Sequence, residues 1–349
     1  MTIPSHVSWF KDIGLQDRPY VGGKGGSLGE LQRAGIAVPA GFVVRTEAFE
    51  RFVLALEQRS TIRSRVERLD PNDLQQVEAG SKELRALVEG ASFPDDLNEA
   101  LLEAHRELMG KSPFPVAVRS SATTEDAADA SFAGLQDTFL WVTSASDMLA
   151  RIRTCWASLY SVESITYRRR RNFPEAGVAM AVVVQTMVDA RNAGVMFTRS
   201  PLTGDRSVIT VESAWGLGSA VVGGEVTPDR WVIGKITGEI SVRTVSDKAI
   251  EHLPAEAGGI LESPVSEDRR NSPSMSDPEL QNLRQIARQV ERHYGCAQDI
   301  EWAVDRRSGQ ILLLQSRPET VWSMKDAAPV ASAIENPLLH VMNVFGGRR

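Results

Sequence analysis

The amino-acid sequence predicts an α+β fold with two lobes, mixed or antiparallel sheets and flanking helices, and three observations support it. Residues 46–110 carry apolar side chains at helical spacing. Residues 116–118 and 179–188 are short apolar runs typical of buried strands. Residues 299–305 and 310–318 alternate as the strands of a hairpin do. The 349 residues suffice for one large two-lobed domain or for two domains.

Composition argues against several classes of protein. The formal net charge of −6 disfavours a general nucleic-acid or membrane-surface binder. No apolar run reaches the eighteen or so residues that span a bilayer, and the amino terminus lacks a charged-then-apolar signal. Cys155 and Cys296 lie far apart without metal-type spacing. We therefore expect a cytoplasmic protein that binds neither nucleic acid nor a membrane.

A glycine-rich segment at residues 21–31 surrounds Lys24 and continues into a predicted helix that places Leu28 and Leu31 on one face. Backbone N–H groups at such helix starts bind phosphates, and a lysine adds a mobile positive charge. The segment does not fit the Walker A pattern, because no Gly-Lys-Ser/Thr closes it at the required spacing. From these residues alone, a phosphate loop and a flexible turn are equally good interpretations.

The helical region from residue 46 has Thr46 as a plausible N-cap, and Pro94 suggests a fresh helix start. Residues 147–167 form a second predicted amphipathic helix, in which Cys155 is a buried structural thiol rather than a nucleophile. Arg168–Arg171 end this helix. They are interpreted as a solvated cap on the helix dipole, with docking of an acidic partner as the alternative.

The stretch from Val116 to Leu140 predicts a phosphate cradle. An apolar strand delivers Arg119 to a block of small hydroxyl residues, where backbone N–H groups can approach an anion closely. The planar guanidinium suits phosphate oxygens. Gly134 and Thr138 follow and could close over the same ligand. An isolated Arg-Ser-Ser would better be interpreted as a polar loop, but a stretch of this length favours the cradle.

The second half predicts a base site and a metal site. The strand at 179–188 carries Gln185, a polar group beside an apolar slot. Strands at 193–198 and 208–212 should pair, residues 251–278 should form a surface loop, and a helix should cover residues 279–294. In the hairpin, alternation can bring Glu301, Gln315 and Arg317 to one face. Carboxylate and amide oxygens there can hold Mg²⁺, and the arginine can hold a terminal phosphate.

These motifs resemble the ATP-binding domain of the pyruvate phosphate dikinase, phosphoenolpyruvate synthase and rifampicin phosphotransferase family. The resemblance runs from about residue 21 to 321 and includes residues 213–218 (Ser-Ala-Trp-Gly-Leu-Gly) and 226–229 (Val-Thr-Pro-Asp). It implies a nucleotide-binding fold of ATP-grasp type that uses ATP and Mg²⁺. It implies that three cations contact the phosphates: Lys24, Arg119 and Arg317. It further implies that Gly134 and Thr138 belong to a loop that closes over the nucleotide and that Gln185 contacts the base or ribose. Glu301 and Gln315 are the implied Mg²⁺ ligands. Lys24, Arg119 and Arg317 are thereby the expected catalytic residues.

In that family, a pyrophosphoryl group passes to a histidine on a separate swivelling domain. None of the five histidines here stands in a carrier-type motif. We therefore expect a separate partner subunit with the phosphohistidine and substrate domains, similar in layout to phenylphosphate synthase, and a small-molecule acceptor such as a phenolic compound. The expected parts are an N-terminal lobe at 1–178, a C-terminal lobe at 179–324 and a linker-like or partner-docking tail at 325–349.

Three alternatives stay open. The chain could be a self-contained kinase that phosphorylates a small molecule directly, a phosphoenolpyruvate synthase-like subunit that acts on pyruvate, or a nucleotide-sensing module without turnover. The set of cations and metal ligands disfavours the sensor, because a pure sensor need not keep the metal ligands.

Overall fold

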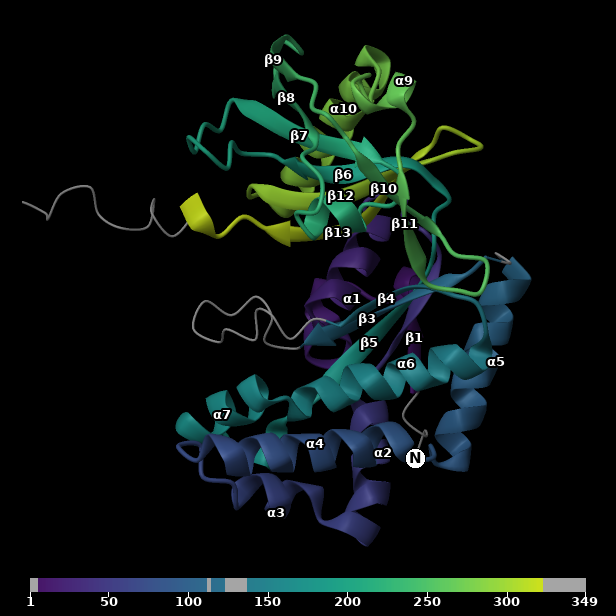
Figure 1. Ribbon diagram of the computed structural model, residues 1–349, viewed down its shortest axis with the longest axis vertical. Helices are drawn as coiled ribbons and strands as arrows, with labels where there is room; N and C mark the ends of the chain where they lie inside the picture. The colour runs from purple at the N-terminus through teal and green to yellow at the C-terminus, as the bar shows by residue number, and fades with distance from the viewer. Residues whose placement is uncertain (1–5, 112–113, 123–136, 323–349) are drawn as a thin grey trace, which may run out of the picture.

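The computed structural model describes residues 6–111, 114–122 and 137–322, and it has two lobes, each built on an antiparallel sheet (Figure 1). The first sheet has the strand order β1-β2-β5-β3-β4. Its strands are β1 (Val7–Trp9), β2 (Gly41–Val44), β3 (Val116–Ala122), β4 (Thr138–Val142) and β5 (Met180–Thr186). The second sheet has the order β13-β12-β6-β7-β8-β9. Its strands are β6 (Ala190–Phe197), β7 (Val208–Trp215), β8 (Asp229–Gly234), β9 (Ile240–Thr244), β12 (Gln298–Asp305) and β13 (Ile311–Pro318).

Helices cover the two sheets unequally. Most belong to the first lobe, in the lower part of Figure 1. The helices α2 (Thr46–Ser60), α5 (Asp95–Lys111) and α6 (Ala145–Ala157) contact the first sheet, and α3 (Ile62–Glu67), α4 (Leu74–Gly90) and α7 (Val162–Arg170) pack on other helices of this lobe. Their core centres on Trp156, whose ring lies 5.1 Å from Phe52 and 5.5 Å from Phe49. The short 3-10 helices are Phe10–Asp12, Leu15–Asp17, Ser158–Tyr160 and Glu175–Gly177.

The second sheet packs its core against α10 (Asp277–Tyr294). A capping box between Ser276 and Glu279 begins this helix, and Gly295 ends it with a left-handed φ of 70°. The remaining short elements of this lobe are α8 (Ser219–Val222), α9 (Glu267–Arg270) and a two-stranded hairpin of β10 (Ile250–Pro254) and β11 (Ile260–Pro264).

The glycine-rich segment lies within α1 (Arg18–Arg33), which is kinked at Gly22 (φ 70°). A Cβ at Gly22 would lie 2.2 Å from the backbone oxygen of Ser121, so a side chain there would collide with β3. The Ser121 hydroxyl donates to the carbonyl of Val21 and accepts from the N–H of Gly25. These glycines therefore allow a close contact between α1 and the first sheet.

Several predicted elements agree with the structure, and others differ from it. The strand pairing of β6 with β7, the helix at 279–294, the fresh start at Pro94 and the 299–318 hairpin are confirmed. Thr46 is the first residue of α2 rather than its cap, because Arg45 has extended backbone and Thr46 is already helical. The predicted 147–167 helix is broken at residues 158–161.

Two larger differences concern the division into lobes. The β5 strand, expected in the second lobe, pairs with β2 and β3 in the first sheet, so the sheets divide the chain between Thr186 and Ala190. The predicted surface loop at 251–278 instead contains β10, β11 and α9. The sequence did not predict these strands because the segment is rich in polar residues. The strand β11 is exposed on both faces and shows no apolar alternation.

The arginines at 168–171 do not act as one group. Arg168 is fully buried and donates to both carboxylate oxygens of Glu175 at 2.9 and 3.3 Å, to the carbonyl of Leu159 and to the hydroxyl of Ser164. It is therefore part of the core, and neither a solvated cap nor a docking residue. The predicted burial of Cys155 is confirmed, and burial raises the pKa of its thiol.

The tail at 325–349 lies outside the described residues. Within the part of the chain that the structure describes, no helix has the length and apolar character needed to cross a membrane.

Candidate functional site

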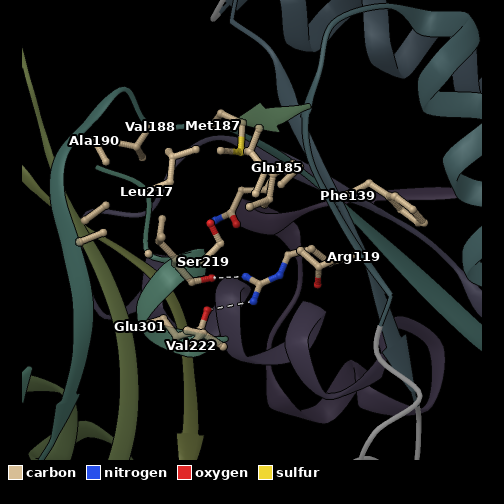
Figure 2. Close-up of a pocket in the computed structure, with 18 of the residues that line it drawn as sticks. Arg119, Phe139, Gln185, Met187, Val188, Ala190, Leu217, Ser219, Val222 and Glu301 are labelled. Carbon is tan, nitrogen blue, oxygen red and sulfur yellow. Dashed lines mark hydrogen bonds and ion pairs between the residues drawn. The ribbon is translucent and has the colours of Figure 1, made fainter. Parts of the chain in front are cut away.

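A cavity of ≈740 Å³ lies between the two lobes (Figure 2). The strands β3, β4 and β5 line it from the first lobe, and β6, β12 and β13 line it from the second. Part of the lining is apolar and includes Phe139, Met187, Val188, Ala190, Leu217 and Val222. The size and the mixture of apolar side chains with a few polar groups are typical of small-molecule and cofactor sites.

Arg119 crosses from the first lobe to the second at this cavity. Its Nη2 donates to Glu301 Oε2 at 2.9 Å and to Gln315 Oε1 at 2.7 Å, and its Nη1 donates to the carbonyl of Leu314 at 3.1 Å. Arg119 Nε is buried and has no hydrogen-bond partner among the described residues. The structure therefore brings together three of the predicted site residues, and one guanidinium group holds the other two.

The predicted metal ligands fit a cation in this arrangement. Glu301 and Gln315 are direct partners across the β12–β13 ladder, so their side chains leave the sheet at the same place. Both oxygens converge on one positively charged nitrogen. A carboxylate and an amide oxygen are hard ligands of the kind that Mg²⁺ shares with nucleotide phosphates.

Gln185 and Thr138 also line the cavity. Gln185 is buried, and its Nε2 has no hydrogen-bond partner among the described residues. A buried donor without a partner costs free energy, so this amide is suited to a ligand with an acceptor atom. Thr138 pairs with Arg119 in the β3–β4 ladder and is exposed. The predicted closing-loop residue Gly134 lies outside the described residues.

Two predicted phosphate contacts lie apart from the cavity lining. Lys24 is buried in α1, and Arg317 extends from β13 with 62% of its side chain exposed. Arg317 Nε is 3.4 Å from Asp299 Oδ2. The arrangement shown in Figure 2 therefore contains Arg119 and Glu301 but neither of these two cations.

Asp299 is a further candidate for the functional site, and it was not among the site residues predicted from the sequence. Its Oδ1 is buried without a hydrogen-bond partner among the described residues, and Arg317 lies opposite it in the β12–β13 ladder. Burial raises the pKa of Asp299, while Arg317 partly lowers it. The signal was present in the sequence, because Asp299 and Glu301 are two residues apart and share one face of the strand.

The glycine-rich segment after β7 contributes to the lining of the cavity. Ser219 lines the cavity and shares a hydrogen bond of 2.8 Å with Nδ1 of His252, whose Nε2 lies 3.3 Å from Glu225. The turn between β10 and β11 reaches the first lobe, where the N–H of Gly259 donates to the carbonyl of Trp141. This hairpin therefore joins the two lobes beside the cavity.

A cavity of this kind between two lobes is typical of domains that bind a small molecule or a cofactor. Residues 18–336 match the family model described as the AMP/ATP-binding domain of pyruvate phosphate dikinase, so the chain belongs to this family. This match confirms the predicted resemblance. The α+β fold class, with two lobes, antiparallel sheets and flanking helices, is also confirmed.

Named relatives share this domain. The probable phosphoenolpyruvate synthase of Methanothermobacter thermautotrophicus is 42% identical over 318 residues, covering 90% of this chain and 46% of the relative. Phosphoenolpyruvate synthase of Aeropyrum pernix is 40% identical, covering 91% and 43%. The chain thus spans less than half the length of these relatives. D-alanyl-alanine synthetase A of Vibrio cholerae is similar over 69% of this chain and 54% of its own, at 13% identity and a TM-score of 0.23.

Proposed function

We propose that this chain is the ATP-binding subunit of a split dikinase-type phosphotransferase. It binds Mg-ATP in the cavity, and the bond between the α- and β-phosphates breaks as a pyrophosphoryl group passes to a histidine on a separate carrier subunit. AMP leaves, and loss of the outer phosphate to water then gives phosphate and a phosphohistidine. The convergence of Glu301 and Gln315 on Arg119 carries this proposal, because it joins an anion-binding group to two metal-type oxygens.

The roles of the side chains follow from this arrangement. Glu301 and Gln315 hold Mg²⁺, which neutralises negative charge on the phosphates when bound. Arg119 then leaves its two partners and donates to phosphate oxygens. Lys24 and Arg317 add phosphate contacts, Gln185 binds the base or ribose, and the segment with Gly134 and Thr138 closes over the nucleotide. These last roles rest on the family to which the chain belongs.

One observation supports a phosphate-accepting histidine outside this cavity. No histidine among the described residues lines the cavity. The proposed partner therefore supplies the phosphohistidine and the substrate site. We propose a cytoplasmic complex in which the acceptor is a small molecule, with phenolic compounds as the first candidates.

The names of the relatives favour one alternative acceptor. They are phosphoenolpyruvate synthases, so a subunit that acts on pyruvate is the second candidate. Product analysis with ATP labelled separately at the α-, β- and γ-phosphates tests these possibilities. The pure chain would be incubated with Mg²⁺ and either phenol or pyruvate, with and without the candidate carrier subunit.

The expected result is labelled AMP and phosphate only when the carrier is present. The acceptor that gains the β-phosphate label identifies the substrate, because the α-phosphate stays in AMP and the γ-phosphate is released. ADP formed by the chain alone, together with a phosphorylated phenol, would contradict the split-enzyme proposal and favour a self-contained kinase. Binding of ATP with no product under any condition, including a carrier proven active with another ATP-binding subunit, would favour a nucleotide sensor.

A further inference from the structure

A second concavity, of ≈520 Å³, lies at the end of the β12–β13 hairpin in the second lobe. It adjoins Ala297 and Glu319, which flank the two strands and are joined by a backbone hydrogen bond of 2.9 Å. We call it the arginine recess. Five cationic side chains and two carboxylates line it: Arg199, Arg206, Lys235, Arg288 and Arg292; Glu291 and Glu319. It shares no lining residue with the cavity between the lobes.

The two carboxylates of the recess already have partners. Glu291 accepts a hydrogen bond of 2.8 Å from Lys235, which is buried. Glu319 accepts from the N–H of Trp322 at 2.7 Å and lies 3.9 Å from the buried Arg199. The recess therefore keeps an excess of positive charge, although the whole chain has a formal net charge of −6.

Arg288 and Arg292 carry this excess. They are four residues apart near the end of α10, so they lie on the same side of the helix. Arg288 is half-buried, and neither arginine has a carboxylate partner within 4.0 Å among the described residues. Two neighbouring guanidinium groups repel each other, and an anion between them relieves that repulsion.

We propose that the arginine recess binds a small, multiply charged anion with clustered phosphate groups. Guanidinium groups present planar pairs of donors that match phosphate oxygens, and several of them around one concavity favour an anion with more than one phosphate. The volume lies within the range of small-molecule sites. The phosphates can belong to a nucleotide or to a molecule without a nucleoside. This site is independent of the proposed phosphotransfer function.

Cys296 provides a local probe because it lines the recess and is exposed, whereas the second cysteine of the chain, Cys155, is buried. The full chain would be treated with iodoacetamide, and modification of Cys296 followed by mass spectrometry with increasing inorganic tripolyphosphate. Sodium chloride at equal ionic strength serves as the reference. We expect tripolyphosphate to slow the modification several-fold and to reach saturation.

Matched variants locate the bound anion. Arg288→Ala and Arg292→Ala should each raise the tripolyphosphate concentration needed for half-maximal protection at least about tenfold, the usual effect of losing a charged hydrogen bond. Arg307→Ala removes the same charge from the exposed turn between β12 and β13 and should leave protection unchanged. Arg119→Ala, which alters the cavity between the lobes, should also leave it unchanged.

The same assay in the Arg119→Ala protein distinguishes the two sources of phosphate. Stronger protection by ATP than by tripolyphosphate assigns the recess to a nucleotide, and equal or weaker protection by ATP assigns it to a ligand without a nucleoside. Protection no greater than that given by sodium chloride would overturn the proposal. Protection lost in Arg119→Ala but kept in both Arg288→Ala and Arg292→Ala would overturn it as well.

Discussion

Two ion pairs of similar length have different surroundings. The pair between Arg119 and Glu301 is 2.9 Å long, and its side chains are 11% and 28% exposed at the cavity. The pair between Lys248 and Asp229 is 2.6 Å long, and both side chains are 0% exposed. One pair joins the two lobes, whereas the other lies inside the second lobe.

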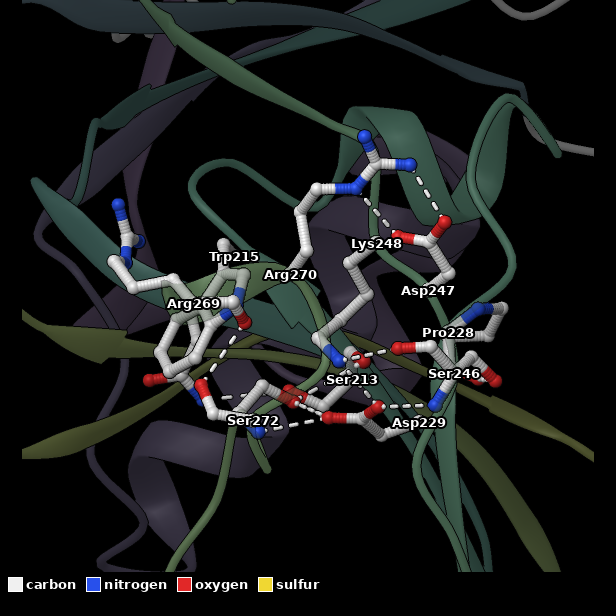
Figure 3. A network of polar contacts seen from close by, with 12 residues as sticks. Ser213, Trp215, Pro228, Asp229, Ser246, Asp247, Lys248, Arg269, Arg270 and Ser272 are labelled. Carbon is white, nitrogen blue, oxygen red and sulfur yellow. Dashed lines mark hydrogen bonds and ion pairs between the residues drawn. The ribbon is translucent and has the colours of Figure 1, made fainter. Parts of the chain in front are cut away.

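The two ion pairs also differ in how completely their polar atoms are hydrogen-bonded. Asp229 accepts from Lys248 and from the N–H of Ser246 at 2.9 Å (Figure 3). It also accepts from the N–H and from the hydroxyl of Ser274, both at 2.7 Å. Arg119 instead keeps a buried Nε without a partner among the described residues. A charge whose partners all come from the protein stabilises the fold, while an incomplete set of partners beside a cavity suits a ligand.

The largest expected effect is on the buried pair. Asp229→Asn removes the negative charge and leaves Lys248 buried without a counterion, which should lower the free energy of unfolding by about 3 to 5 kcal/mol. Urea denaturation measures this change. Asp247→Asn, which breaks the exposed pair with Arg270 seen in Figure 3, is the control and should change stability little. Equal losses of unfolding free energy in the two variants would contradict the claim that the buried pair stabilises the fold more than the exposed pair does.

The next effect concerns the cavity pair and appears in activity. Arg119→Ala should reduce phosphoryl transfer with the carrier by about 100-fold or more, as the loss of a charge-stabilising donor does in other enzymes. Its melting temperature should stay close to that of the wild type, because Glu301 keeps access to water. Arg119→Lys should recover little activity, since an ammonium lacks the planar fork. Wild-type turnover in Arg119→Ala would contradict the proposal that Arg119 binds the phosphates of ATP.

A smaller effect is expected in the metal requirement. Glu301→Gln should raise the Mg²⁺ concentration needed for half-maximal transfer about tenfold or more, because a neutral amide replaces a charged ligand. A magnesium titration of initial rates measures this shift. Glu239→Gln, at an exposed position between β8 and β9, removes the same charge as a control. An unchanged titration curve for Glu301→Gln would show that the hairpin does not hold the metal.

The smallest effect tests whether an incomplete set of partners costs stability. Because burial raises the folded-state pKa of Asp299, the folded protein binds the proton more tightly than the unfolded chain does. Stability should therefore fall as pH rises from the ordinary carboxyl pKa through the raised one. Asp299→Asn should remove this slope and gain about 1 kcal/mol or less at neutral pH. Urea denaturation from pH 4 to 7 checks it, and an identical slope in both proteins would contradict it.

The site could be predicted where one strand pattern determines the geometry. Alternation along two adjacent strands predicted that Glu301 and Gln315 share a face, and the structure pairs them. A register shift between Glu301 and Trp302, which the alternation does not indicate, sets that pairing. Gln185 was similarly recognisable as the polar group of an apolar strand. In each case, the relevant residues are close in sequence.

Contacts between distant segments could not be predicted. The bonds from Arg119 to β12 and β13 join residues more than 180 positions apart, and no local pattern indicates them. Arg168 was misinterpreted because its run of arginines resembles a solvated helix end. In the structure, Arg168 is buried and donates to the carboxylate of Glu175, which follows after the end of the helix. The strands β10 and β11 were missed because their stability depends on neighbours rather than on their own apolar pattern.

The position of α1 limits how far this protein can be treated as modular. Its Leu31 belongs to the core of the second lobe, while Val21 and Leu28 pack with the first sheet. A fragment cut after β5 would carry Leu31 away from its partners, and the complementary fragment would lack one of its own core residues. The two lobes are thus units of architecture that cannot serve as building blocks for chimaeras, unless the helix is duplicated so that each piece keeps its own copy.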